Sequence, residues 1–107
     1  MSEIKDLISS EEFNAAINGD KPVLVDFFAS RCGPSKMQTP ILYEFKEDLG
    51  DKVEVVKVDV DQNGEVAAKY GVESIPTLAV FVGGELKEKK VGLTTKAGLS
   101  EMLIKYL

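Results

Sequence analysis

Residues 27–37, FFASRCGPSKM, decide the fold because they join two different sequence patterns. Residues 22–29 form an apolar run interrupted by a single acid, Asp26, which is typical of a buried β-strand. Over residues 37–49, apolar side chains recur every four positions, and this spacing predicts a helix. The only cysteine of the chain, Cys32, therefore lies where a strand ends and a helix begins.

This location favours a reactive thiol at Cys32. The first turn of a helix carries unpaired backbone N–H groups and the positive end of the helix dipole, which together stabilise an anion such as a thiolate. The alternative is a buried structural cysteine, a common role for a lone cysteine. The neighbours Arg31, Gly33, Pro34 and Ser35 are polar or turn-forming rather than core-like, and they favour the reactive interpretation.

Composition limits the possible functions. A chain of 107 residues with 44% hydrophobic and 29% charged residues is expected to form a single domain over residues 1–107. A chain of this length can bury a stable core without disulfide bonds or a structural metal ion. The net charge of −5 argues against nucleic-acid binding. No apolar run approaches the roughly 18 residues of a membrane span. Because the chain has no histidine, a Cys-His catalytic pair and the usual zinc sites are excluded, and no metal or cofactor is expected.

The cellular compartment is predicted from the cysteine count and from the start of the chain. One cysteine cannot form an internal disulfide, which is typical of a reducing environment. The first five residues lack the basic and then apolar pattern of a secretory signal. We therefore expect a cytoplasmic protein.

The rest of the chain predicts an α/β fold with a mixed central sheet and helices on both faces. Ser9 and Glu12 have capping-box spacing at the start of a first helix, and Gly83-Gly84 indicates a hairpin between two strands. Strands separated by helical segments are typical of parallel pairing, whereas a hairpin pairs antiparallel strands. The expected strands are a short one around residues 4–7, followed by 23–29, 53–60, 77–82 and 85–91.

The segment around Cys32 resembles the thioredoxin family, whose pattern there is Asp-Phe-Trp-Ala-x-Trp-Cys-Gly-Pro-Cys-Lys. This chain departs from the pattern at Phe28 and Arg31, where tryptophan is usual, and at Ser35, where the second cysteine is usual. The resemblance extends over essentially the whole chain and implies the thioredoxin fold. The other matching positions are Asp26, Pro40, Lys57, Asp61, Ile75-Pro76-Thr77, Gly84 and Gly92.

The resemblance implies a protein-disulfide reductase that is re-reduced by a thioredoxin reductase. In the family, the cysteine at the position of Cys32 attacks a substrate disulfide, and the second cysteine then resolves the mixed disulfide. Ser35 cannot perform thiol–disulfide exchange, so we expect the reaction to stop at the mixed disulfide. Two origins of Ser35 remain open: a natural single-thiol relative, or a cysteine replaced on purpose to trap a covalent complex. The second is favoured because the other family positions are largely intact.

Asp26 and Lys57 are expected to lie close together, because each lies within an apolar strand and the two strands can be neighbours. A buried carboxylate is costly unless it is paired or protonated. The resemblance implies that Asp26 handles the proton of the second cysteine. The alternative is a structural buried ion pair between Asp26 and Lys57.

The resemblance also implies a substrate surface around Cys32. In the family, the bond equivalent to Ile75–Pro76 is cis and faces the cysteine, so an extended substrate can pair with Ile75 as an added strand. Gly33, Pro34 and Gly92 complete this surface. For Arg31 two interpretations stay open, a solvated charge on an exposed loop or a cation that favours the thiolate of Cys32.

Two other functions compete with the reductase, which is expected to be a monomer. The first is a redox-inactive binding module with the same fold. The second is a single-thiol, glutaredoxin-like protein that holds an iron–sulfur cluster with glutathione. Pro34 and the lack of an obvious glutathione-anchoring motif argue against the second.

Overall fold

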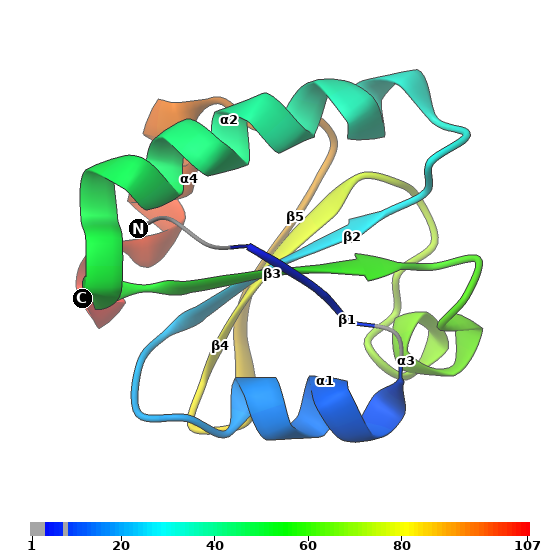
Figure 1. Ribbon diagram of the computed structural model, residues 1–107, viewed down its shortest axis with the longest axis horizontal. Helices are drawn as coiled ribbons and strands as arrows, with labels where there is room; N and C mark the ends of the chain where they lie inside the picture. Colours follow the sequence, from blue (N-terminus) through cyan, green and yellow to red (C-terminus); the bar gives the residue numbers. More distant parts are fainter. Residues whose placement is uncertain (1–3, 8) are drawn as a thin grey trace.

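The computed structural model describes residues 4–7 and 9–107, and this part of the chain forms a five-stranded mixed sheet (Figure 1). The strand order is β1-β3-β2-β4-β5. β1 and β2 both pair with β3 in parallel, whereas β4 is antiparallel to β2 and to β5. The predicted mixed sheet is confirmed. The strands are β1 Lys5–Leu7, β2 Val23–Phe28, β3 Glu54–Asp59, β4 Thr77–Val82 and β5 Glu85–Val91.

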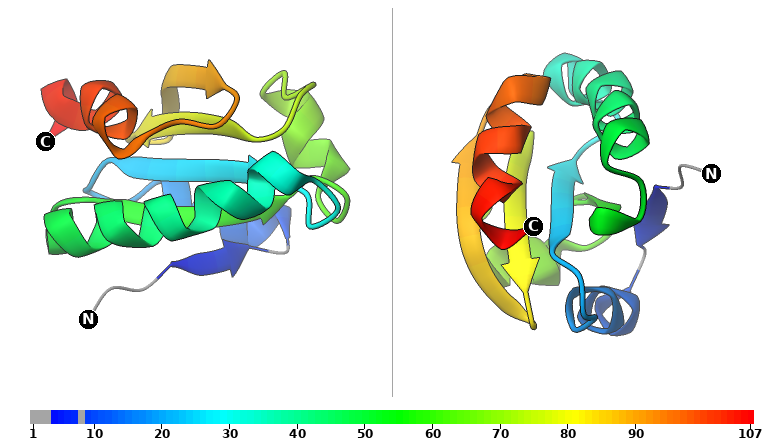
Figure 2. Two further views of the ribbon diagram at one scale, coloured as in Figure 1. Left: turned by 90° about the horizontal axis from the view of Figure 1, so that it is seen from above. Right: turned by 90° about the vertical axis from the view of Figure 1, so that its left-hand side faces the viewer.

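Helices cover both faces of this sheet, as the sequence predicts. α2 and α4 lie above the sheet in Figure 1, and α1 and α3 lie below it. Seen from above in Figure 2, α2 and α4 run side by side. The helices are α1 Ser10–Ile17, α2 Gly33–Leu49, α3 Gly64–Lys69 and α4 Lys96–Leu103, with short 3₁₀ turns η1 Gly50–Lys52 and η2 Ile104–Tyr106.

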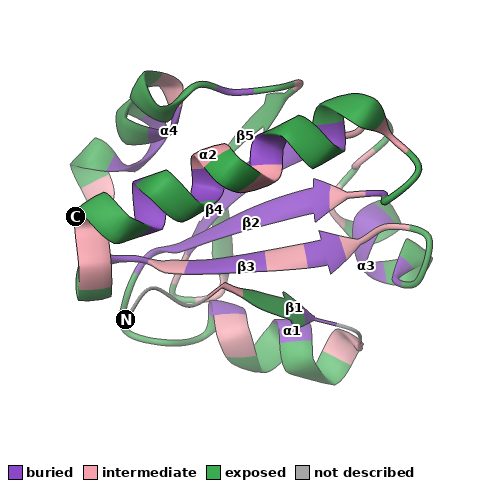
Figure 3. Cartoon of the chain, turned by 45° about the horizontal axis from the view of Figure 1, so that its top comes forward, coloured by how far each residue is buried: buried purple, intermediate pink, exposed green. Residues whose placement is uncertain are grey.

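Strand alternation decides which side chains enter which core. In β2, Val23, Val25 and Phe27 pack with α1 and α3, whereas Leu24 packs with α2 and α4. Because successive side chains of a strand point to opposite faces, Asp26 lies on the same face as Leu24. Figure 3 shows β2 largely buried and β5 largely exposed. The single acid of the central strand is thus directed toward the α2 side of the sheet.

The predicted local signals are present at several element ends. Ser9 is the N-cap of α1, and its side chain accepts a hydrogen bond from the Glu12 N–H at 3.1 Å. Thr95 caps α4 in the same way. Both hairpin glycines have positive φ, 59° at Gly83 and 84° at Gly84, a conformation that other residues adopt only with strain. β5 lies at the edge of the sheet, and its many charges are typical of an edge strand.

The buried face of α2 differs from the four-residue stripe of the sequence. Met37 is 59% exposed. Four residues turn a helix about 40° more than one full turn, so a stripe of that spacing winds away from the core. From Ser35 to Phe45, the buried positions are spaced by three, four and three residues. The stripe consists of Met37, Ile41, Phe45 and Leu49, whereas the buried residues are Ser35, Gln38, Leu42, Phe45 and Lys46.

No helix in residues 4–7 and 9–107 has the length and apolar character needed to cross a membrane. The sequence prediction about a secretory signal falls partly on residues 1–3, which lie outside the described residues.

Candidate functional site

Cys32 is the N-cap residue of α2, a helix of 17 residues. The Cys32 N–H donates to the Ala29 carbonyl at 3.0 Å, which closes the turn after β2. The Cys32 carbonyl accepts the Lys36 N–H at 3.2 Å and so begins the helix. The half-buried thiol is therefore held at the positive end of the helix dipole, as the sequence predicts.

The loop before β4 faces this thiol. The Ile75–Pro76 peptide bond is cis, and the Ile75 carbonyl oxygen lies 3.7 Å from the Cys32 Sγ. Within the described part of the chain, the Ile75 N–H forms no backbone hydrogen bond. This N–H is therefore free to pair with an extended chain that approaches Cys32.

Gly92 lies against the same loop. Its N–H donates to the Pro76 carbonyl at 2.8 Å, and its φ is 99°. A Cβ at this position would meet no atom of the protein within 4 Å, so a side chain would project into open space beside Pro76. Gly33 and Pro34 are exposed in the first turn of α2. The structure thus gathers the expected substrate-facing residues around Cys32.

Ser35 occupies the position one helical turn after Cys32. Its side chain is 2% exposed, and its hydroxyl accepts the Ala29 N–H at 3.5 Å. No hydrogen bond joins Ser35 to Cys32 within the described ranges. The hydroxyl is therefore engaged with the turn that follows β2.

Asp26 is fully buried, and neither of its carboxyl oxygens has a hydrogen-bond partner among the described residues. Burial raises the pKa of Asp26 from 3.8 to about 7, the positive charge of Lys57 opposes this rise, and Asp6 adds to it. Near neutral pH, the buried carboxyl can therefore exchange a proton.

Lys57 lies beside Asp26 in the register of β2 and β3, but its ammonium group binds elsewhere. The Lys57 Nζ donates to Thr39 Oγ1 at 2.8 Å and lies 4.3 Å from the centroid of the Phe28 ring. The predicted proximity to Asp26 is confirmed. The alternative of a structural buried ion pair is wrong, because the Asp26 oxygens have no partner in the described chain.

A hollow of about 150 Å³ lies beside Ser35. Two cationic side chains, Lys36 and Lys57, line it from α2 and β3. The other lining residues are Phe28, Ala29, Ser30, Ser35 and Thr39.

Arg31 forms a two-point ion pair with Asp61, which lies in the turn after β3. The Nε–Oδ2 distance is 3.1 Å and the second guanidinium nitrogen lies 3.2 Å from Oδ1. The hydrogen bond to Asp61 and then its charge raise the pKa of Arg31, and Cys32 adds a smaller contribution. Arg31 is exposed but not freely solvated. Sequence reasoning named Asp61 as a family match and missed it as the partner of Arg31.

Gln38 is a second contact that sequence reasoning missed. This fully buried side chain donates from Nε2 to the Thr94 carbonyl at 2.9 Å and accepts the Thr94 N–H on Oε1 at 2.8 Å. Thr94 Oγ1 in turn donates to the Gly92 carbonyl at 3.0 Å. Gln38 therefore fixes the loop that carries Gly92 against α2. The sequence signal that could have pointed to this contact is the polar residue Gln38 itself, three positions after Ser35.

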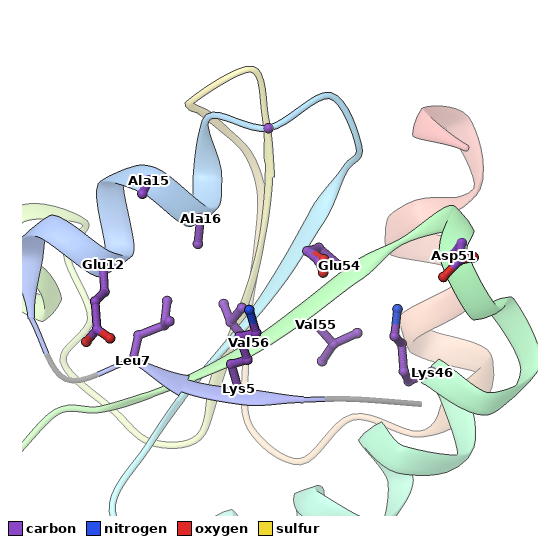
Figure 4. Close-up of a pocket in the computed structure, with 11 residues that line it drawn as sticks. Lys5, Leu7, Glu12, Ala15, Ala16, Lys46, Asp51, Glu54, Val55 and Val56 are labelled. Carbon is purple, nitrogen blue, oxygen red and sulfur yellow. The ribbon is translucent and has the colours of Figure 1, made fainter. Parts of the chain in front are cut away.

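A cavity of about 620 Å³ lies away from Cys32, between α1, β1 and the first half of β3 (Figure 4). None of the predicted site residues lines it. Lys46, one of its lining residues, is buried and donates to the carbonyls of Gly50 and Val53 at the end of α2. In the described residues, no cluster of three or more His, Cys, Asp or Glu side chains could hold a metal ion.

Comparisons with known proteins agree with this geometry. The Thioredoxin family model matches residues 5–105. A thioredoxin of Bacillus subtilis is 46% identical over 99 residues, which cover 92% of this chain and 95% of that protein. Thioredoxin 1 of a Nostoc species is 41% identical over 107 residues and covers both chains completely. The structure of a mutant thioredoxin from Halobacterium salinarum superposes with a TM-score of 0.90 at 33% identity, covering 98% of this chain and 91% of that one. With this fold, this site and these relatives, the chain belongs to the thioredoxin family.

Proposed function

We propose that the protein is a thiol–disulfide oxidoreductase that attacks protein disulfides through Cys32. The observation that carries this proposal is the location of the Cys32 thiol, at the N-terminus of α2 and 3.7 Å from the Ile75 carbonyl. The thiolate is the attacking species in thiol–disulfide exchange. The free N–H of Ile75 offers a place for an extended substrate to pair beside the sulfur.

In the proposed reaction, the Cys32 thiolate attacks one sulfur of the substrate disulfide. A new S–S bond forms to Cys32, the old S–S bond breaks, and its electron pair leaves on the other substrate sulfur, which then takes a proton from solvent. Ser35 has no thiol with which to displace the substrate, so the mixed disulfide persists until an external thiol attacks it. Asp26 would then have no second cysteine whose proton it could handle.

The proposed partners are disulfide-containing proteins and a thioredoxin reductase, with the protein acting as a monomer in the cytoplasm. The family supports these partners, and a single cysteine supports a reducing compartment. The absence of the second cysteine predicts little turnover with the reductase.

Mass spectrometry tests this proposal. After the protein is mixed with a disulfide-containing protein, we expect one covalent adduct per chain, which disappears when dithiothreitol is added. Ser35→Cys should abolish the long-lived adduct and restore turnover with a thioredoxin reductase, because a nearby thiol resolves the adduct at high effective concentration. Cys32→Ser should lose both. Catalytic disulfide reduction by the unaltered chain would contradict the role given to Ser35.

A redox-inactive binding module is the second candidate, and the presence of only one cysteine favours it. The two functions differ in their response to alkylation. If the protein is a binding module, a partner is still captured after Cys32 reacts with iodoacetamide. If the protein acts by thiol–disulfide exchange, that reaction abolishes capture.

A further inference from the structure

The charge next to the reactive sulfur is fixed in place. Arg31 is the only arginine of the chain and directly precedes Cys32, the only cysteine. The Arg31 guanidinium makes two hydrogen bonds to one carboxylate, that of Asp61, at 3.1 and 3.2 Å. The two-point contact restricts the orientation of this exposed cation far more than a single contact to a lysine would.

The rest of the segment adds positive charge. Residues 27–37 contain Arg31 and Lys36 but no acid, although the whole chain carries a net charge of −5. Lys36 and Lys57 line the hollow beside Ser35, and neither forms an ion pair with a carboxylate among residues 4–7 and 9–107.

Three acids lie at the end of β3 and on the loops that follow it, and two of them are engaged. Asp61 binds Arg31, and Asp59 Oδ1 accepts the Asp61 N–H at 2.8 Å. The third, Glu73, is exposed in the loop before Ile75. Arg31 and Lys36 therefore lie on the Cys32 segment itself, Lys57 lies beside it in β3, and the three acids lie outside that segment.

We propose that Arg31 is a specificity-determining residue that favours disulfides flanked by acidic groups. This inference rests on the proposed function and names the substrate class of the same site. When a thiolate attacks a disulfide, negative charge spreads over three sulfurs, and acidic groups on the substrate add repulsion. A guanidinium held beside Cys32 offsets that repulsion, and it repels basic substrates.

The test uses three small disulfides of different charge: 3,3′-dithiodipropionate (dianionic), 2-hydroxyethyl disulfide (neutral) and cystamine (dicationic). The rate of adduct formation at Cys32 is measured by mass spectrometry for each. For each protein, the rate with the dianionic disulfide is divided by the rate with the dicationic disulfide. Comparing this rate ratio between a variant and the unaltered chain cancels the differences between leaving groups. Arg31→Gln should lower the rate ratio about three- to tenfold at low salt. The effect should shrink near 1 M salt, where charges are strongly screened.

Two further variants separate charge from structure. Arg31→Lys keeps the charge but loses the two-point contact, and it should retain most of the ratio. Lys21→Gln removes the same charge at the opposite end of β2, where Lys21 is exposed, and should leave the ratio unchanged. Equal slowing of all three disulfides by Arg31→Gln would mean a merely structural ion pair and would overturn the inference, as would an unchanged ratio.

Alkylation separates this inference from the proposed function. The ratio of iodoacetate to iodoacetamide rates reports the charge around the same thiolate without disulfide chemistry, and Arg31→Gln should lower it. If the alkylation ratio responds but Cys32 attacks none of the disulfides, the proposed function fails and takes the substrate class with it. If Cys32 attacks all three disulfides without charge preference, only the inference about Arg31 fails.

Discussion

At the scale of single residues, Asp26 is a buried acid whose burial carries a cost in free energy. It lies in the central strand β2, fully buried, and its two carboxyl oxygens have no partner among the described residues. Lys57 is next to it in register but donates to Thr39 instead. The carboxyl therefore relieves the cost of burial by binding a proton, which is why its pKa rises to about 7.

Asp26→Ala should stabilise the fold at pH 8. The folded-state pKa of about 7 is above the unfolded value, so the folded chain holds this proton more tightly. The stability that this tightly held proton gives the folded chain is fully present below about pH 4. It is lost as the pH rises through 7. The difference between a pKa of 3.8 and one of about 7 corresponds to about 4 kcal/mol, which is an upper bound for the gain.

Urea unfolding of this variant at pH 5 and pH 8 measures the effect, with the exposed Asp20→Ala as control. The advantage of Asp26→Ala over the unaltered chain should be larger at pH 8 than at pH 5. A variant that is less stable than the unaltered chain at pH 8 would contradict this account.

At the scale of elements, α2 connects the parts of the site. Its N-terminus carries Cys32, and two turns later Gln38 holds the loop that carries Gly92. Both of the Gln38 bonds go to the backbone of one residue, Thr94. One rigid helix therefore sets the positions of two segments that lie far apart in the sequence.

Gln38→Met tests this connection. Methionine has a similar volume but leaves the N–H and carbonyl of Thr94 without partners in a buried place. The expected loss in the free energy of unfolding is about 1–3 kcal/mol. Gln62→Met, at an exposed position, is the matched control and should change stability by less than about 0.5 kcal/mol. Equal effects of the two substitutions in urea unfolding would show that the Thr94 contact contributes little.

At the scale of the whole molecule, two apolar cores share one sheet. One core packs α1 and α3 against the sheet, and the other packs α2 and α4 against the opposite face. The central strands β2 and β4 send alternate side chains into both. Neither core can open without disturbing the strands that support the other, so we expect one cooperative unit.

Ile17→Ala and Leu99→Ala test this expectation, because each truncates one buried helix residue on opposite faces of the sheet. Each should cost about 2–5 kcal/mol. Urea transitions followed by far-UV circular dichroism and by tyrosine fluorescence should coincide in both variants. Ile104→Ala, at a side chain that is 70% exposed, is the control. Separate transitions in either variant would contradict a single domain over residues 1–107, which stays a prediction.

The sequence by itself determined the order of the elements and the location of the thiol. Apolar runs predict strands, Ser9 marks a helix start, and Gly83-Gly84 marks the hairpin. Cys32 at the start of a helix followed from the change of pattern within residues 27–37. All of these signals are local, so a single segment carries enough information for each.

Only the tertiary structure decided the partners of the polar side chains. Arg31 and Asp61 are 30 residues apart, and Gln38 and Thr94 are 56 apart. Lys57 bonds Thr39 rather than its neighbour in register, Asp26. Such pairs depend on how helices rotate over the sheet and how loops meet. In α2 the four-residue apolar spacing predicted a helix but not which of its side chains are buried, since Met37 is 59% exposed. Packing sets the rotation of each helix, because the side chains of the helix must fit between those of the sheet without leaving voids.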